Sequence, residues 1–174
     1  MILSTSMANP EERALGTLKE MLIDRGYTIR ESGGDHYCMD IGRRIICFLC
    51  VEDKLNIGEL KDKFYVMNKE KVRRCIIVYR ESVTPSVLKA IETIQEFYVE
   101  LFSINELQFN ITTHRLVPRH MVATPQEKKE LVRYHGKLPL LLYADAIRRY
   151  YDFKRGEIIR ITRKDGSILY RVVK

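Results

Sequence analysis

The sequence lacks the features of membrane and secreted proteins. No apolar run approaches the roughly 20 residues that a transmembrane helix needs, and no basic region with an apolar stretch and a small-residue cleavage site opens the chain. We therefore expect an intracellular, soluble protein without a membrane partner. The 174 residues contain no repeat, low-complexity tract or flexible linker. Their 45% hydrophobic and 30% charged fractions are typical of globular proteins, so we expect one or two small domains.

Cysteine is absent from the second half of the chain. Cys38, Cys47, Cys50 and Cys75 all occur in apolar, strand-like stretches of the first half. Cys47 and Cys50 have the CxxC spacing of zinc and redox sites, but two apolar residues separate them and no second pair follows. We expect four reduced, buried thiols, with no metal ion and no cofactor.

Acidic residues are scarce in the second half. Residues 1–104 carry 15 basic and 16 acidic side chains, whereas residues 105–174 carry 15 basic and 7 acidic ones, a net charge of +8. Nine cations gather near the C-terminus: Arg148, Arg149, Lys154, Arg155, Arg160, Arg163, Lys164, Arg171 and Lys174. Such asymmetry indicates a polyanion or an acidic protein surface as partner, and charge does not choose between them. Tyr143, Tyr150 and Tyr151 could stack on bases, although such tyrosines more often fill a core or an interface.

Helix and strand signals alternate through residues 9–104. The pattern predicts helices at 10–25, 56–70 and 85–94, a hairpin over 27–41, and further strands at 43–51, 73–79 and 97–103. Asn9 caps the first helix in this interpretation, Gly26 ends it, and Thr84 caps the third. Alternation of this kind favours a small α/β domain with a partly parallel sheet.

The pattern changes after residue 105. Val117-Pro118 predicts an extended segment, Thr124 with Glu127 starts a helix that Gly136 ends, and Asp145 caps a short helix. A terminal hairpin then spans residues 156–173, with its turn at 163–166. We expect an α+β domain here.

Four short motifs occur in order in this second half. They are H-x-L-V-P-x-H (114–120), T-x-x-E-K-x-E-L (124–131), Leu138-Pro139 followed by Asp145, and K-R-G-x-x-x-x-I (154–161). Together they resemble the C-terminal domain of the fifth shared subunit of eukaryotic nuclear RNA polymerases, which is homologous to the H-type subunit of archaeal RNA polymerase. KEMLIDRGY (19–27) and VTPSVLK (83–89) extend the resemblance, in register, over the first half. Ala146 replaces a proline of the family pattern, and the shortened loops suggest a compact lineage such as a parasite or a large DNA virus.

The resemblance implies a non-catalytic subunit of DNA-directed RNA polymerase. Residues 1–104 would form a jaw domain with a nuclease-like sheet along downstream double-stranded DNA, and residues 105–174 an assembly domain that docks on the largest subunit among other polymerase subunits. Thr84, Pro85, Ser86 and Lys89 would lie near DNA. The subunit interface would include His114, Val117, Pro118, His120, Lys154, Arg155 and Gly156. The protein would work in the nucleus, or in the cytoplasm or virion if a large DNA virus encodes it.

Two other functions stay open. Asp40, Glu52 and Lys54 mimic the layout of magnesium-dependent nucleases, in which carboxylates hold the ion and a lysine orients water. A free-standing basic DNA-binding module would also account for the charge. His114 and His120 would lie on the same side of an extended segment, but a metal site would need two more ligands, so we expect them to form structural hydrogen bonds.

Overall fold

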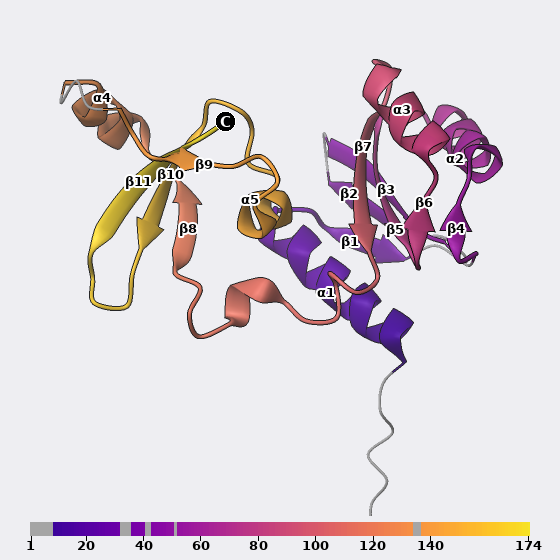
Figure 1. Ribbon diagram of the computed structural model, residues 1–174, viewed down its shortest axis with the longest axis horizontal. Helices are drawn as coiled ribbons and strands as arrows, with labels where there is room; N and C mark the ends of the chain where they lie inside the picture. Colours follow the sequence, from indigo (N-terminus) through magenta and orange to yellow (C-terminus); the bar gives the residue numbers. More distant parts are fainter. Residues whose placement is uncertain (1–8, 32–35, 41–42, 51, 134–136) are drawn as a thin grey trace, which may run out of the picture. The chain divides into compact units, whose positions relative to one another are not determined.

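The chain folds into two compact units, Met1–Phe109 and Asn110–Lys174. The structure, a computed structural model, describes residues 9–31, 36–40, 43–50, 52–133 and 137–174, without the side chains of residues 30–31, 36–40, 43 and 132. Helices and sheets are mixed in both units, as Figure 1 shows, so the α+β class predicted from the sequence is confirmed. In the described part of the chain, no helix is long and apolar enough to cross a membrane.

A five-stranded mixed sheet organises the first unit. Its order is β1 (Ile29–Glu31), β2 (His36–Asp40), β3 (Arg43–Leu49), β5 (Arg74–Tyr79) and β7 (Tyr98–Ser103). The first three strands pair antiparallel, and β3, β5 and β7 pair parallel. The two parallel connections contain α2 (Ile57–Lys69) and α3 (Pro85–Thr93), and they also contribute the short parallel strands β4 (Lys54–Leu55) and β6 (Ser82–Val83). The predicted partly parallel sheet is present, whereas β4 and β6 were not predicted.

Both faces of this sheet are covered by helices. Figure 1 shows α1 (Pro10–Asp24) on one side and α2 with α3 on the other. On β3 and β5, alternate residues serve opposite layers: Ile46 and Ile77 belong to the core cluster that includes Leu60 and Val87 of the two helices. The intervening residues are also buried, as Ile76 at 0% exposure shows. Strands buried on both faces have continuous apolar runs, which explains their sequences.

The helix starts of this unit differ in how they are capped. Asn9 and Asn56 both form capping boxes, in which the asparagine and the glutamate three residues later bond to each other's backbone amides. Thr84 occupies the N-cap position of α3, but its side chain makes no capping hydrogen bond. The predicted positions of Thr84 at the N-cap and Pro85 at the first helical position are therefore confirmed, but Thr84 provides no side-chain cap.

A buried ion pair connects α1 to the sheet. Arg25 follows the helix, and its guanidinium donates to both carboxylate oxygens of Glu100 on β7 at 3.0 and 2.9 Å. The two side chains are only 3% and 10% exposed. Removing one member of such a pair leaves a charge with little access to water, so the pair fixes the geometry of this layer.

The second unit contains a four-stranded sheet. Its order is β8 (Arg119–Val122), β10 (Ile158–Thr162), β11 (Ile168–Val173) and β9 (Leu140–Leu141). β10 pairs antiparallel with both neighbours, and β11 pairs parallel with β9. The predicted terminal hairpin is confirmed, and Gly166 turns it at a φ of +83° that favours glycine. The short strand β9 was not predicted.

Three short helices complete the unit: η1 (Ile111–Thr113), α4 (Pro125–Arg133) and α5 (Ala146–Tyr151). The predicted caps are confirmed, since Asp145 accepts from the amides of Ile147 and Arg148, and Thr124 and Glu127 bond reciprocally at the start of α4. The expected end of α4 at Gly136 lies outside the described residues. A small core of Leu141, Phe153, Ile159, Ile161 and Val173, joined by Tyr151, holds this unit together.

Three of the four thiols lie in the core, as predicted. Cys47, Cys50 and Cys75 are unpaired by disulfides and at most 2% exposed. Burial raises the pKa of Cys75 to about 12, so this thiol stays protonated and unreactive. The side chain of Cys38 lies outside the described residues.

Candidate subunit interface

The segment before β8 presents the first predicted motif. The backbone turns at Arg115 and Leu116, closed by a bond from the Val117 amide to the His114 carbonyl at 2.9 Å. His114 ends η1 with an exposed ring, and its Nδ1 accepts from the Leu116 amide at 3.3 Å. Because this turn lies between them, His114 and His120 do not lie on the same side of one extended segment. The two histidines therefore have different surroundings.

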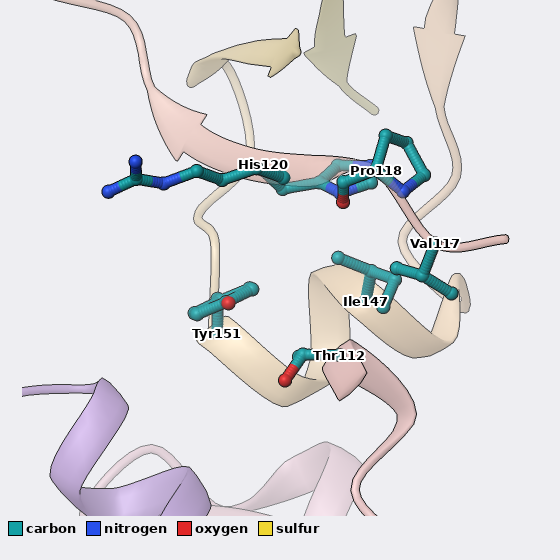
Figure 2. Close-up of a pocket in the computed structure, with 7 residues that line it drawn as sticks. Thr112, Val117, Pro118, His120, Ile147 and Tyr151 are labelled. Carbon is teal, nitrogen blue, oxygen red and sulfur yellow. The ribbon is translucent and has the colours of Figure 1, made fainter. Parts of the chain in front are cut away.

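His120 lies on β8 beside a cavity of about 190 Å³. Figure 2 shows Pro118 and His120 on one side of it and Thr112 of η1 and Tyr151 of α5 on the other, with Val117 beside Ile147 of α5. His120 Nδ1 lies 2.8 Å from the Pro118 carbonyl oxygen, which can only accept, so this nitrogen carries the proton. Burial lowers the pKa of His120 below its usual value of 6.5, despite the opposing effects of this carbonyl and of Asp145. The prediction of structural hydrogen bonds is confirmed for both histidines.

Val117 and Pro118 also line a second depression, of about 360 Å³. Its other lining residues are Arg115 and Leu116 of the preceding turn and Arg163 and Lys164 of the terminal hairpin. Leu116 is 75% exposed, the highest value among the exposed large apolar side chains of the described residues. The L-V-P sequence therefore forms a ridge of apolar side chains with a hollow on each side.

The K-R-G motif makes contacts inside its own unit. Lys154 forms an ion pair with Asp152, and the guanidinium carbon of Arg155 lies 4.3 Å from the ring centroid of Tyr143. Gly156 has a φ of +82°, which favours glycine, and its amide donates to the Val173 carbonyl. These intramolecular roles are sufficient to explain the motif, so its part in an interface stays a prediction.

Several of the nine C-terminal cations are likewise used internally. Arg148 is buried, donates to the Phe153 carbonyl at 2.7 Å and stacks on Tyr143 at 3.5 Å, whereas Arg155 on the same ring is exposed. Arg160 lies 3.5 Å from Glu127, which also accepts from the Tyr170 hydroxyl at 2.8 Å, and Arg171 donates to the Leu140 carbonyl. Local packing therefore accounts for much of the cation cluster.

Backbone and side-chain hydrogen bonds hold Glu127 ionised. Donation from the Thr124 amide, followed by the hydroxyls of Tyr170 and Thr124, lowers the pKa of this carboxyl below its usual 4.5. The carboxylate thus connects the start of α4 to β10 and β11 through Arg160 and Tyr170. The contacts of Glu127 therefore hold the start of the helix formed by the motif at residues 124–131 against the sheet.

Comparison with known proteins decides the family. The family described as "RNA polymerase Rpb5, C-terminal domain" matches residues 109–173. The relative named "DNA-directed RNA polymerases I, II, and III subunit RPABC1" from Caenorhabditis briggsae is 31% identical over 93% of this chain and 83% of its own length. Its Dictyostelium discoideum counterpart is 34% identical over 90% and 93%, and that of Caenorhabditis elegans 34% over 77% and 68%. This chain belongs to the RPABC1 family.

As an RPABC1-family member, the chain is a non-catalytic subunit of DNA-directed RNA polymerase and takes part in transcription. The match covers both compact units rather than the C-terminal unit by itself. The predicted resemblance is therefore confirmed, including its extension over the first half of the chain.

Strand register argues against the nuclease alternative for this RPABC1-family chain. Asp40 pairs with Arg43 at the first residue of β3, whereas Glu52 follows Leu49, the last residue of that strand. Six residue steps of about 3.3 Å separate these backbone positions by roughly 20 Å, whereas the ligands of one ion must come from positions that lie close together. Lys54 belongs to the separate two-stranded sheet. The three residues therefore do not form a magnesium site.

The predicted DNA-proximal residues lie together at the start of α3. Pro85, Ser86 and Lys89 are exposed and Thr84 is half-buried.

Sequence reasoning missed Arg115, Leu116, Arg163 and Lys164 as a group, because 48 residues separate the two turns that bring them to one hollow. For Tyr150 and Tyr151, the core interpretation is confirmed, since they pack edge to face and Tyr151 stacks on Phe153.

Proposed function

We propose that the second unit docks on the largest subunit of the polymerase while the first unit lies along downstream duplex DNA. The observation that carries the docking half is apolar exposure. Of the thirteen large apolar residues that are exposed in the described part of the chain, eight lie in the second unit, although it is the smaller one. Such surface is typical of a domain that buries it against a partner. The eight are Leu116, Met121, Val122, Leu140, Leu142, Tyr143, Ile168 and Leu169.

The motif residues supply the centre of this interface in our proposal. Val117 and Pro118 lie between two hollows, where projecting side chains of a partner can insert on either side. His114 and His120 brace the ends of that ridge through Leu116 and Pro118. Lys154, Arg155 and Gly156 support the interface by holding the Tyr143 turn and the start of β10 in place.

The DNA half of the proposal is supported at the start of α3. Thr84 makes no side-chain capping bond and Pro85 has no amide hydrogen, so the Thr84 side chain does not occupy the amides of the first turn of α3, where an anion could accept a hydrogen bond. Lys89, one turn later, is exposed. Helix starts of this kind bind phosphate groups, whose contacts position a protein on a duplex without reading its sequence.

Reconstitution tests the docking half. The purified chain is mixed with the largest polymerase subunit from its own source and passed through a size-exclusion column, where we expect one co-eluting peak. Pro118→Asp places a charge on the apolar ridge and should abolish the peak, while Pro139→Asp, at an exposed proline of this unit, should leave it. Separate elution of the unmodified chain would refute the proposal.

The DNA half has its own test in the assembled polymerase. Lys89→Glu should leave co-elution unchanged and weaken retention of downstream duplex severalfold, because it puts a negative charge near phosphates. Lys61→Glu, which changes an exposed lysine of α2, is the control. Loss of subunit binding in the Lys89 variant would contradict the division of labour between the two units.

Two further properties follow from the proposal. A subunit of nuclear polymerases works in the nucleus, so fluorescence microscopy of the tagged chain should show nuclear signal.

The remaining alternative, a free-standing DNA-binding module, requires that the isolated chain bind duplex tightly with an affinity that falls steeply with salt. We expect weak binding by the isolated chain and stronger engagement after assembly.

A further inference from the structure

Two turns that are distant in sequence meet around the 360 Å³ hollow. The turn at Arg115 and Leu116 and the terminal hairpin turn, through Arg163 and Lys164, border it, with Val117 and Pro118 between them. The hollow thus combines three apolar side chains with three cations. We call it the basic groove.

The cations of the basic groove have few internal partners. Within the described part of the chain, no ion pair is formed by Arg115 or Lys164. The acid nearest in sequence is Asp165, which interacts electrostatically with Arg163 but accepts its hydrogen bond from the Ser167 amide at 2.8 Å. The groove therefore keeps a positive charge, in contrast to Arg148, Lys154 and Arg160, each of which has an acidic neighbour.

The apolar part of the groove is as informative as its charge. Leu116 is 75% exposed, and a large apolar side chain in water is a cost that burial against a partner removes. Val117 and Pro118 are half-buried and line the same groove. DNA phosphates would interact with the cations and leave this apolar surface unused. A polypeptide with both acidic and apolar side chains satisfies both halves of the groove.

We propose that the basic groove binds an acidic segment of another polymerase subunit, with carboxylates on Arg115, Arg163 and Lys164 and an apolar side chain on Leu116 and Pro118. The proposal rests on the proposed docking function and adds the chemistry of the partner segment. Arginines pair bidentately with carboxylates, which favours a fixed register of the bound segment.

Site-specific crosslinking in the assembled polymerase tests the occupant. The variant Leu116→p-benzoylphenylalanine is incorporated into the complex, irradiated and digested, and the crosslinked product is sequenced by mass spectrometry. We expect a crosslink to a protein segment with several Asp or Glu residues and at least one large apolar residue. A crosslink to DNA, one to a segment without acidic residues, or no crosslink at all would overturn the inference while leaving the proposed docking intact. If the unmodified chain does not enter the complex, the docking proposal fails and this inference falls with it.

Charge reversal measures the electrostatic part. The double variant Arg163→Glu, Lys164→Glu should weaken binding to the largest subunit, or to the complex that lacks this chain, about tenfold or more and reduce its salt dependence. The matched control, Lys129→Glu with Arg133→Glu on α4, reverses two exposed cations outside the groove and should change affinity less than twofold. Equal effects of the two pairs would show that overall charge, and not the groove, governs binding.

A second variant guards against misfolding of the hairpin turn. Leu116→Asp changes a side chain that already lies in water, and it places a carboxylate where we expect the partner's acids. It should weaken binding at least tenfold with an unchanged melting temperature, whereas Tyr65→Asp, at a side chain of α2 that is 72% exposed, should leave binding unchanged and is its control. Unchanged binding by the Leu116 variant would contradict the inference.

Discussion

The two units of this chain differ in how their apolar side chains are distributed. In the first, helices cover both faces of the central sheet, and the larger core cluster draws on β3, β5, α2 and α3. In the second, the core cluster has five buried residues, a few others such as Ile147 and Tyr150 are also buried, and apolar side chains such as Leu116 and Leu142 remain in water. Small domains bury a smaller fraction of their surface and have less stability to lose. The first unit thus has the larger core of its own, and the second leaves more of its apolar side chains exposed.

Matched core truncations give the largest expected contrast. Ile159→Ala and Ile77→Ala each remove the same atoms from a side chain with 0% exposure, at a cost of about 2–5 kcal/mol. We expect Ile159→Ala to unfold the second unit at 37 °C and Ile77→Ala to leave the first unit folded, because only the larger core retains enough other contacts. Hydrogen exchange with mass spectrometry resolves the two units in the full chain. Equal loss of protection by both variants would remove the distinction.

Removing one carboxylate charge from each unit should give a smaller contrast, and here the first unit should lose more stability than the second. Glu100→Gln removes the carboxylate charge that faces the Arg25 guanidinium, 3% exposed, and should lower the stability of the first unit by about 3 kcal/mol. Glu127→Gln in the second unit affects a partner, Arg160, that is 36% exposed, and water compensates there. Urea unfolding monitored for each unit measures both. A larger effect of the Glu127 variant would contradict this ranking.

Burial should also decide which of the two arginines that stack on Tyr143 contributes more to the stability of the second unit. Arg155→Met removes an exposed cation–π contact and should cost about 0.5–1 kcal/mol. Arg148→Met also leaves the Phe153 carbonyl without its donor in a buried place and should cost about 1–3 kcal/mol. Thermal melts of the two variants provide the measurement. A reversed order would mean that the stacking on Tyr143, and not the buried hydrogen bond, dominates.

The smallest expected effect is a pH dependence confined to the second unit. Burial lowers the pKa of His120 in the folded state, so the unfolded chain binds the proton more readily. The stability of the second unit should therefore decrease as the pH falls below about 6.5, and it should be recovered as the pH rises. His120→Asn, which can still donate to Pro118, should flatten this dependence. Exchange rates at about pH 5.5 and about pH 7.5, on either side of the usual histidine pKa and corrected for intrinsic chemistry, test it with the first unit as internal reference.

Much of the fold could be predicted because its signals are local. Asn9, Gly26 and Asp145 define helix ends through their own backbone preferences and short-range hydrogen bonds, and the apolar runs at 43–51 and 73–79 can be buried only as inner strands. Thr84 shows where this reasoning fails. A side chain in a capping position need not form the cap, because its rotamer is decided by neighbours that the sequence does not reveal.

The features of the candidate site also fall into two groups, those that the sequence shows and those that only the structure shows. The order of the H-x-L-V-P-x-H and K-R-G motifs is a property of the chain itself, and with the other motifs it was sufficient to indicate the family. The surplus of cations and the absence of a second cysteine pair can also be read from the sequence. Only the folded structure showed that Lys154 and Arg155 contact Asp152 and Tyr143, whereas Arg163 and Lys164 meet Arg115 and Leu116 across the basic groove. Charge is fixed by composition, but whether a cation is neutralised or presented to a partner depends on which distant turns the sheet brings together.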